Sequence, residues 1–345
     1  MYLLKTDING NQSWFRAIGG SYHDRGYDIE KTRSEEYVIV GTTQSFGAVG
    51  EDVFLIKTDT NGNLLWQRTF GGNGDDIGRD IQQTNDGGFI IAGYTSSYGY
   101  SNDVYLIKTD SLGNQSWSRT FGGSNDDCGY CVEQTSDGGY IITGHTESYS
   151  YDVWLIKTDS LGNQQWQQTF GGGSYDFGSS VQQTSEGGYI ISGNTESYGA
   201  GGRDIYLIKT DSLGNQSWWR TFGGSNHDFG YNVQQTTHNG YIIVGESRSY
   251  SNGERDVYLV KTDANGNQSW FIYLGGVYQD YGSSVLHTSD GNYVVVGATN
   301  SFGAGNWDAY LIRIEEPSPS ISFNSPLLNY NGIVVNRSSN QILYI

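Results

Sequence analysis

The sequence predicts an all-β fold, a β-propeller of four-stranded antiparallel blades with about 50 residues in each repeat. A Lys-Thr-Asp triplet returns at intervals of 49 to 52 residues, beginning at Lys5, Lys57, Lys108, Lys157, Lys209 and Lys261, and Arg313 takes the seventh place. Each interval holds four short runs rich in β-branched and aromatic residues and bounded by Gly, Asn and Asp, which is typical of strands. No window shows helical periodicity.

The four runs differ in character. The first follows Asp-x-Gly, as at Gly78–Thr84, the second is apolar, as at Phe89–Gly93, and the third reads like Asp52–Asp59. The fourth is built on one tryptophan that we expect to pack between blades: Trp14, Trp66, Trp117, Trp166, Trp218 and Trp270. Glycines in Thr84–Gly88 and Asp110–Asn114 fall where hairpin turns need positive φ. We also expect each repeated lysine to pair with a recurring aspartate.

The number of blades depends on how the two ends of the chain are used. The chain begins with third and fourth runs, Tyr2–Asp7 and Ser13–Ile18. If Ile321–Ser325 supplies a fourth run, Gly332–Asn336 and Gln341–Ile345 are left to form a blade with Met1–Ile18, which gives seven blades. In the alternative, Ser13–Ile18 alone closes the last blade and gives six. Seven is favoured. Residues 1–314 form the propeller, and 315–345 are a linker and tail.

All length variation lies in one loop. The gaps between the second and third runs have 6 to 9 residues, as in Thr43–Asp52, Thr95–Asp103 and Thr146–Asp152, and the rest of each interval has 43 residues. In an up-and-down blade, the 2–3 and 4–1 loops emerge at the same end. Because repeat proteins place variable loops on the binding face, we assign ligand binding to that end.

The repeated sequence motifs resemble those of a known bacterial family. Phe-Gly-Gly-x-x-x-Asp-x-Gly, Thr-x-Asp-Gly-Gly-Tyr-Ile-Ile-x-Gly-x-Thr-x-Ser and Asp-Val-Tyr-Leu-Ile-Lys-Thr-Asp-x-x-Gly-Asn are similar to the SBBP-type β-propeller repeat over residues 1–314. This resemblance implies a secreted or surface propeller and no settled activity. After the linker around Pro317 and Pro319, the tail resembles the start of a type IX secretion sorting domain, so it is either a truncated sorting module or part of the last blade.

Charge and composition restrict the partners. A formal charge of −18 and a pI near 4.5 argue against nucleic acid, which requires basic patches. No apolar run approaches the ~20 residues of a membrane span. The acidic, Lys-poor composition and the family resemblance predict an extracellular or cell-surface monomer whose leader is absent from this chain. Cys128 and Cys131 lie too far apart on one strand for a disulfide, so we expect two ordinary thiols.

One carboxylate recurs four residues after each Gly-Gly. These aspartates would ring one mouth of the propeller channel and could hold Ca²⁺ or another cation as a cofactor: Asp24, Asp76, Asp127, Asp176, Asp228 and Asp280. The favoured alternative is that each carboxylate accepts hydrogen bonds from a turn or from the next blade.

Aromatic residues in the variable loop are candidate ligand contacts. One follows a serine in each copy: Phe46, Tyr98, Tyr149, Tyr198, Tyr250 and Phe302. Exposed, they would stack on sugar rings or peptide side chains; the alternative is a plug between adjacent blades. Residues that do not recur are better candidates for specificity: Tyr100, Tyr151, Arg203, Arg255, Trp307 and His23 or His227.

Three functions remain open. The first is a binding or scaffold propeller that recognises a glycan, an envelope component or a protein. The second is a carbohydrate-active enzyme of sialidase or lyase type, although no nucleophile elbow, H-E-x-x-H or phosphate loop occurs. The third is a structural repeat without a ligand.

Overall fold

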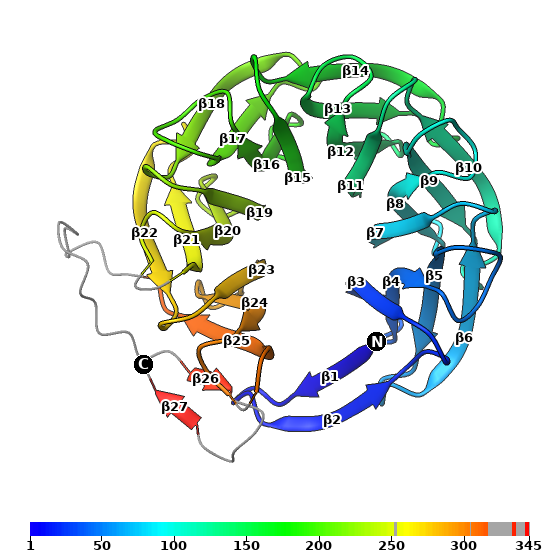
Figure 1. Ribbon diagram of the computed structural model, residues 1–345, viewed down its shortest axis with the longest axis horizontal. Coiled ribbons are helices and arrows are strands. Elements are labelled where there is room, and N and C mark those ends of the chain that lie inside the picture. Colours follow the sequence, from blue (N-terminus) through cyan, green and yellow to red (C-terminus); the bar gives the residue numbers. More distant parts are fainter. Residues whose placement is uncertain (252–253, 304, 317–332, 336–341, 345) are drawn as a thin grey trace. The chain divides into compact units, whose positions relative to one another are not determined.

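The computed structural model describes residues 1–251, 254–303, 305–316, 333–335 and 342–344 (Figure 1). Its contacts divide the chain into two compact units. Unit 1 comprises Met1–Thr6 and Gln12–Gln183, and unit 2 comprises Asp7–Asn11 and Thr184–Ile345. We call each set of four runs that begins with a first run a copy.

Unit 1 contains fifteen strands. β1 (Tyr2–Thr6) and β2 (Gln12–Ala17) pair with each other. Copies 1 to 3 follow as four-stranded sheets in chain order: β3 (Asp24–Lys31), β4 (Tyr37–Thr43), β5 (Asp52–Thr58), β6 (Leu64–Phe70), β7 (Asp76–Gln83), β8 (Phe89–Thr95), β9 (Asp103–Thr109), β10 (Gln115–Phe121), β11 (Asp127–Gln134), β12 (Tyr140–Thr146), β13 (Asp152–Thr158) and β14 (Gln164–Phe170). The last strand is β15 (Asp176–Gln183), the first run of copy 4.

Unit 2 continues the same pattern. It contains β16 (Tyr189–Thr195), β17 (Asp204–Thr210), β18 (Gln216–Phe222), β19 (Asp228–Gln235), β20 (Tyr241–Ser247), β21 (Asp256–Thr262), β22 (Gln268–Leu274), β23 (Asp280–His287), β24 (Tyr293–Thr299) and β25 (Asp308–Ile314). β19 to β22 form the four-stranded sheet of copy 5, and β23 to β25 form the three-stranded sheet of copy 6. Beyond them, β26 (Ile333–Val335) pairs with β27 (Ile342–Tyr344).

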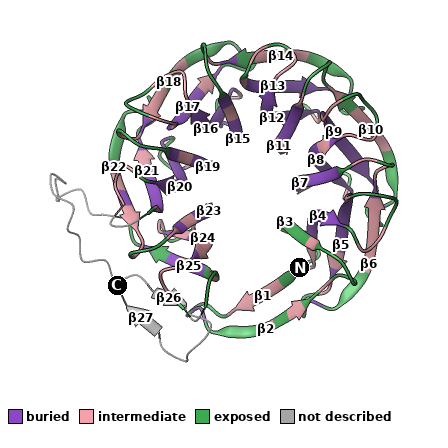
Figure 2. Cartoon of the chain, viewed as in Figure 1, coloured by how far each residue is buried: buried purple, intermediate pink, exposed green. Residues whose placement is uncertain are grey.

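The second and third strands of most copies are buried on both faces (Figure 2). Val104, Leu106 and Ile107 in β9, for example, are at most 1% exposed. Such continuous apolar strands are expected when a sheet is covered by a neighbour on each side. Their burial explains why the second and third runs carry no alternating polar pattern.

The fourth-strand tryptophans join successive copies, as predicted. Trp66 lies 6.2 Å from Phe89, measured between ring centroids, and Trp117 lies 5.9 Å from Tyr140. The same contact recurs in unit 2 between Trp218 and Tyr241 at 5.9 Å. A Cβ added to Gly113, which has φ 76°, would come within 2.7 Å of the Trp66 ring. The turn glycine is therefore required both by its backbone conformation and by the packing of the preceding copy.

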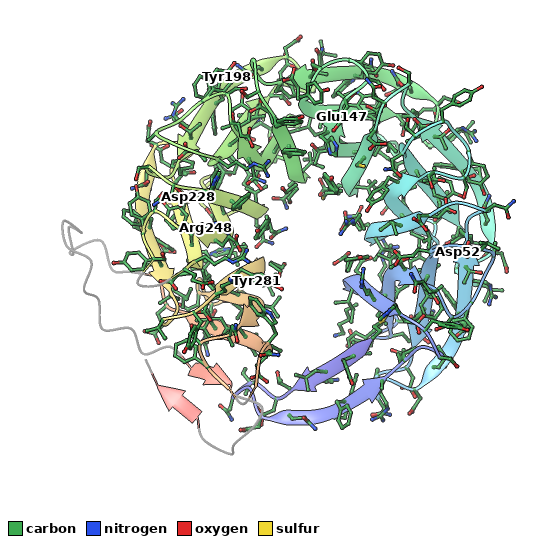
Figure 3. All side chains as sticks on the ribbon, viewed as in Figure 1. Asp52, Glu147, Tyr198, Asp228, Arg248 and Tyr281 are labelled. Carbon is green, nitrogen blue, oxygen red and sulfur yellow. The ribbon has the colours of Figure 1, made fainter. Side chains whose placement is uncertain are left out.

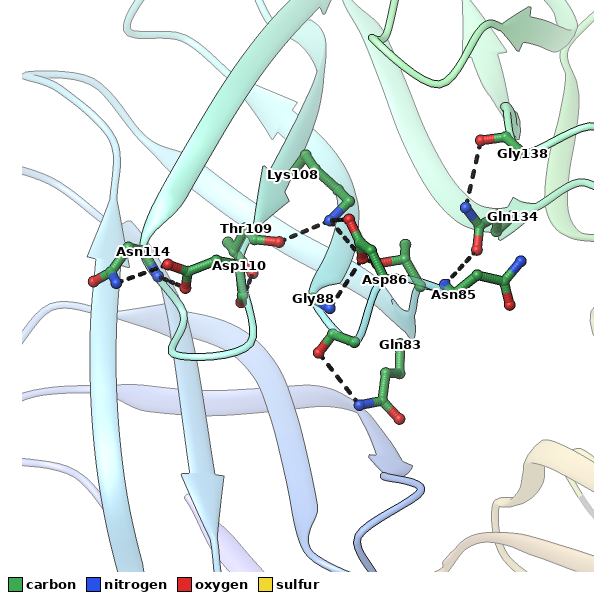
Figure 4. A network of polar contacts seen from close by, with 12 residues as sticks. Gln83, Asn85, Asp86, Gly88, Lys108, Thr109, Asp110, Asn114, Gln134 and Gly138 are labelled. Atoms are coloured by element: carbon green, nitrogen blue, oxygen red, sulfur yellow. Dashed lines mark hydrogen bonds and ion pairs between the residues drawn. The ribbon is translucent and has the colours of Figure 1, made fainter.

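The turns explain the repeated lysine and aspartate (Figure 4). Lys108 Nζ forms an ion pair with Asp86 at 2.9 Å and donates to the carbonyl of Thr109 at 2.8 Å. Asp110 accepts hydrogen bonds from the backbone N–H and the side-chain amide of Asn114 at 2.8 and 2.9 Å. The predicted pairing with an aspartate is also confirmed at Lys157 and, as arginine, at Arg313, whereas Lys57 pairs with Glu36.

The structure has six blade copies rather than the seven that we favoured. Among the described residues, β1 pairs with β2, and β26 pairs with β27, each in a two-stranded sheet. The predicted fourth run at Ile321–Ser325 lies outside the described residues. The prediction was wrong because it assigned every apolar segment to a blade, although a short apolar segment alone does not define a blade partner. The thiols of Cys128 and Cys131 are free, as expected.

Candidate functional site

The 2–3 and 4–1 loops meet at one end of the strands in each unit. In unit 1, the N–H of Asp76 donates to the carbonyl of Glu51 at 2.6 Å, which joins the 2–3 loop of copy 1 to the first strand of copy 2. In unit 2, the N–H of Asp280 makes the same contact with Arg255 at 2.8 Å. We call this end the loop end. The predicted placement of the variable loops is thus confirmed within each unit.

The recurring aspartate at the start of each first strand is enclosed by hydrogen-bond donors. Asp76 is 0% exposed and accepts from the Ser97 hydroxyl at 2.6 Å, from the Gly72 N–H at 2.9 Å and from the Thr95 hydroxyl. Asp127, Asp228 and Asp280 have equivalent serine contacts, and Asp24 accepts from Ser45 at 2.8 Å. This geometry agrees with the capping alternative. Among the described residues, no group of three or more His, Cys, Asp and Glu side chains could hold a metal ion.

The recurring loop aromatics pack within their own copy. Tyr98 lies 5.6 Å from Tyr105 of its third strand and donates to the carbonyl of Gly71 at 3.0 Å, while its side chain remains 54% exposed. The other members make the same contact with the third strand: Phe46 with Phe54, Tyr149 with Trp154, Tyr198 with Tyr206, Tyr250 with Tyr258 and Phe302 with Tyr310. These ring contacts lie within one copy, whereas the plug that we considered would lie between adjacent blades.

The loop-end positions that differ most between copies lie on the first and second strands. Each first strand has a β-bulge around its fourth residue in every copy whose pairing the structure describes. The bulged residues are Tyr27, Arg79, Tyr130, Tyr231 and Ser283. The neighbouring Asp and Gly of the first strand are the same in all six copies. Bulges redirect side chains and are common beside functional sites.

Two such residues of copies 5 and 6 line a pocket in unit 2. The pocket has a volume of about 310 Å³ and is lined by Tyr231, Glu246, Arg255, Tyr281 and Ser283. Tyr281 is the second residue of β23 (Figure 3). Trp307 lies 5.5 Å from the Tyr281 ring and is 47% exposed. The pocket thus combines aromatic faces with a carboxylate, a guanidinium and a hydroxyl.

The charges in this pocket are paired. Glu246 is 1% exposed and accepts from Arg255 Nη1 through both carboxylate oxygens, at 2.8 and 3.0 Å. Arg255 also donates from Nη2 to Gln279 Oε1 at 2.6 Å. Burial and the neighbouring Glu246 raise the pKa of the Tyr231 phenol, which stays protonated at neutral pH. The pocket therefore offers hydrogen-bonding groups fixed in place and little net charge.

Other predicted specificity residues are distributed over both units. In unit 2, Arg203 pairs with Glu196 at 2.6 Å and lies 5.8 Å from the Phe229 ring, and His227 stacks on the same ring. In unit 1, Tyr151 lies 4.7 Å from Tyr175, whereas Tyr100 is fully exposed. His23 is also exposed. The structure brings only Arg255 and Trp307, of all the predicted residues, to the pocket and its edge.

Sequence reasoning missed Tyr231, Glu246, Tyr281 and Ser283. They lie inside strands, where the repeat directs attention to conserved packing positions. A comparison of the copies contains the missing signal: the sixth residue of the second strand is Thr42, Tyr94, His145, Asn194, Glu246 or Ala298, between an invariant glycine and a threonine or serine. Positions that vary between copies while their neighbours stay the same are better candidates for ligand contacts than the recurring aromatic residues.

Comparison with known sequences gives little information. No family model matches the chain, so the resemblance to the SBBP-type repeat and to a sorting domain stays a prediction. Regulatory protein FlaEY of Caulobacter vibrioides (strain ATCC 19089 / CIP 103742 / CB 15) is 24% identical over 132 residues. That match covers 32% of this chain but only 14% of FlaEY. Among the described residues, no helix has the length and apolar character needed to cross a membrane.

Comparison with solved structures identifies the fold. The WD40 domain of Pan2 from Neurospora crassa matches with a TM-score of 0.57 and 12% identity over 92% of this chain and 80% of that chain. A protein of unknown function from Dyadobacter fermentans matches with a TM-score of 0.53 and 12% identity over 85% of this chain and 95% of that chain. At such identities the likeness concerns fold alone. The chain is a β-propeller with four-stranded antiparallel blades.

Proposed function

We propose that this β-propeller is a binding module of the extracellular space or cell surface, and that it recognises a neutral glycan at the loop end. The pocket lined by Tyr231, Glu246, Arg255, Tyr281 and Ser283 carries the proposal. Its volume of about 310 Å³ falls at the lower end of the range for small-ligand pockets. A protein partner would instead need a contact surface of roughly 800 Å² on each side.

The chemistry of the lining matches a sugar ring. A hexose has an apolar C–H face that stacks on an aromatic ring and hydroxyls around its edge that need fixed donors and acceptors. Tyr281, with Trp307 beside it, supplies the aromatic surface. Glu246 and Arg255 supply acceptors and donors whose positions are set by their mutual hydrogen bonds. Such aromatic surface next to a few polar groups is typical of ligand pockets.

Charge supports a neutral ligand. Arg255 is compensated by Glu246, and the whole chain carries a formal charge of −18, so anionic sugars would be repelled. The carboxylate of Glu246 is held by an arginine instead of facing a second carboxylate, which favours binding over glycoside hydrolysis. The acidic, Lys-poor composition supports a location outside the cell.

A glycan array followed by calorimetry with the best neutral glycan tests the proposal. Ser283→Tyr places in copy 6 the residue that copy 5 carries at the same position, Tyr231, and should fill the pocket without disturbing the strand. Tyr281→Ala removes the stacking surface. Both variants should bind the glycan at least about tenfold more weakly than the wild type, which corresponds to about 1.4 kcal/mol.

Leu213→Ala is the matched control in unit 2. Leu213 is 64% exposed in the turn between β17 and β18, at the other end of the strands, and its removal should leave binding unchanged. Unchanged affinity in both pocket variants would exclude the pocket as the binding site. An array without a neutral glycan ligand would exclude glycan recognition, and release of new reducing ends from a bound glycan would favour the enzymatic alternative.

A further inference from the structure

Unit 1 carries a series of contacting aromatic side chains at the loop end of copies 3 and 4. Tyr130 of β11 stacks on His145 of β12, with ring centroids 5.5 Å apart, and His145 meets Phe177 of β15 edge-on at 4.8 Å. Phe177 stacks in parallel with Tyr175 at 6.2 Å, and Tyr175 meets Tyr151 at 4.7 Å. We call this series, together with Tyr27 of β3, the aromatic track.

Arg79 of β7 joins Tyr27 to the rest of the track. Its guanidinium lies 4.4 Å from the Tyr27 ring centroid and 5.8 Å from that of Tyr130. It also donates from Nη2 to the Tyr94 hydroxyl at 3.2 Å. Its guanidinium thus lies against three tyrosine rings, those of Tyr27, Tyr94 and Tyr130. The planar guanidinium thus extends the surface formed by the rings.

His145 has an unsatisfied polar atom within the track. It is 8% exposed, and its Nδ1 has no hydrogen-bond partner among the described residues. Burial lowers the pKa of the imidazole to about 4, so the ring is neutral and can accept or donate one hydrogen bond at neutral pH. A buried polar atom without a partner needs an explanation, and a ligand hydroxyl would supply one.

The rest of the track is open and polar at its margin. Tyr27, Tyr151 and Tyr175 are 37%, 47% and 43% exposed. Glu147 lies at the loop end of β12, and its pKa is raised by burial and by the neighbouring Asp126. Carboxylates at this position accept hydrogen bonds from hydroxyl groups and repel anions. Aromatic faces bordered by acceptors fit an extended, uncharged, hydroxyl-rich chain.

We infer that the aromatic track binds a neutral polysaccharide along several successive sugar rings, each stacked on an aromatic face at the loop end of unit 1. The inference rests on the proposed function only for the chemical class of the ligand. It adds that the ligand is a polymer and that its affinity depends on chain length. Copy 5 in unit 2 repeats Phe177 and Tyr130 as Phe229 and Tyr231, but it has Glu246 in place of His145.

Affinity electrophoresis of the full chain tests the inference. The gels contain dextran, laminarin, xylan or galactomannan as neutral polymers and polygalacturonate as an acidic one. The wild type should be retarded by at least one neutral polymer and not by polygalacturonate. Calorimetry with oligosaccharides of the retarding polymer should then show affinity rising with chain length.

Two variants test polymer binding by the aromatic track without disrupting the fold. Tyr151→Ala/Tyr175→Ala removes exposed rings and should weaken polymer binding at least about tenfold, because two stacking contacts are lost. Tyr130→Ser, which copies the residue at Ser179 in copy 4, should weaken it as well while the melting temperature stays close to that of the wild type. Leu161→Ala, at a 60% exposed turn position, is the matched control.

The outcomes distinguish the track from the pocket. Loss of polymer binding in the track variants, with normal binding in Ser283→Tyr, would support the track and exclude the pocket. Wild-type binding in both track variants, or affinity independent of chain length, would overturn the track even if the pocket variants fail to bind. Retardation by no neutral polymer, or only by polygalacturonate, would also overturn it.

Discussion

Side-chain acceptors on several first strands bind the backbone of the next copy. Gln82 Oε1 accepts from the N–H of Gln134 at 2.5 Å, and Gln234 Oε1 accepts from the N–H of His287 at 2.6 Å. In copy 3 the same position is Glu133, which accepts from the N–H of Gln183. The contact needs only a neutral acceptor, so an ionisable residue at this position makes the stability of the fold depend on pH.

Replacing Glu133 by glutamine should remove a pH dependence of stability. Burial raises the pKa of Glu133 from 4.5 to about 7 in the folded protein. A raised folded-state pKa stabilises the protein fully below about pH 4.5, and this contribution is lost as pH rises through 7. Glu133→Gln should therefore increase the free energy of unfolding at pH 8 by about 2 kcal/mol and change it little at pH 4.5, measured by urea denaturation.

Gln82→Glu is the reciprocal control. It places the carboxyl group of copy 3 at the equivalent position of copy 2 and should create a loss of stability between pH 5 and pH 8. If neither substitution changes the slope of stability against pH, the carboxyl group of Glu133 is not desolvated as the contact implies.

The hydroxyl that caps Asp76 can be tested in the same way. Thr95 donates to the buried carboxylate and accepts from the N–H of Ser97 at 3.0 Å. Thr95→Val should lower the free energy of unfolding by about 1–3 kcal/mol, because a buried carboxylate loses a donor. Thr95→Ser should cost much less, since Ser247 makes this contact with Asp228 in copy 5. A Thr95→Val variant as stable as the wild type, in thermal unfolding, would show that the hydroxyl contributes little.

At the scale of the element, the turns between first and second strands require a left-handed residue. Four copies have glycine there, including Gly87 with φ 84° and Gly138 with φ 83°. Copy 1 has Glu35 with φ 69°, and copy 5 has Asn239 with φ 60°. Asparagine adopts this conformation more readily than glutamate, for which it is strained.

Glu35→Gly should consequently stabilise the protein by about 1 kcal/mol. The ion pair between Lys31 and Glu35 is exposed on both sides, so its loss should offset little of this gain. Asn239→Gly should give a smaller increase. Urea denaturation should show a larger gain in the free energy of unfolding for Glu35→Gly than for Asn239→Gly. A destabilised Glu35→Gly would show that the exposed ion pair outweighs the backbone conformation.

Strand positions and turn chemistry were predictable, but the bulges were not. The predicted second run, Phe89–Gly93, became β8 at Phe89–Thr95, and the predicted first run, Gly78–Thr84, became β7 at Asp76–Gln83. β-branched and aromatic composition and turn glycines act locally, so the sequence reveals them directly. A bulge depends on the register between two strands, and nothing in the first run alone reveals which residue, such as Tyr231, is displaced from the pairing.

At the scale of the whole molecule, the net charge predicts how ligand binding responds to salt. With a formal charge of −18, any charged ligand would be attracted or repelled in a strongly salt-dependent way. The proposed neutral glycan should bind with an affinity that changes less than about twofold between 50 and 500 mM NaCl, measured by calorimetry. A steep dependence on salt would indicate a charged ligand. A melting temperature unchanged by Ca²⁺ would argue against the aspartate ring as a cation site.

The number of blades could not be derived from the repeat alone. β1 and β2 carry the motifs of a third and a fourth run, and β26 and β27 carry no repeat motif, but no motif specifies the sheet that a terminal strand joins. The number of apolar segments at the two ends of the chain favoured a seventh blade. Pairing between segments far apart in the chain is decided by tertiary contacts, which leave six copies.

The sequence by itself determined the blade, its four runs, the turn glycines, the packing tryptophans and the end at which the variable loops emerge. These features follow from local backbone preferences and from a period that repeats them six times. Only the tertiary structure decided that Tyr231, Glu246, Arg255, Tyr281 and Ser283 share one pocket, and that Tyr27 and Tyr151 belong to one aromatic track. These residues are brought together by bulges and by contacts between copies about 50 residues apart, which no local pattern encodes.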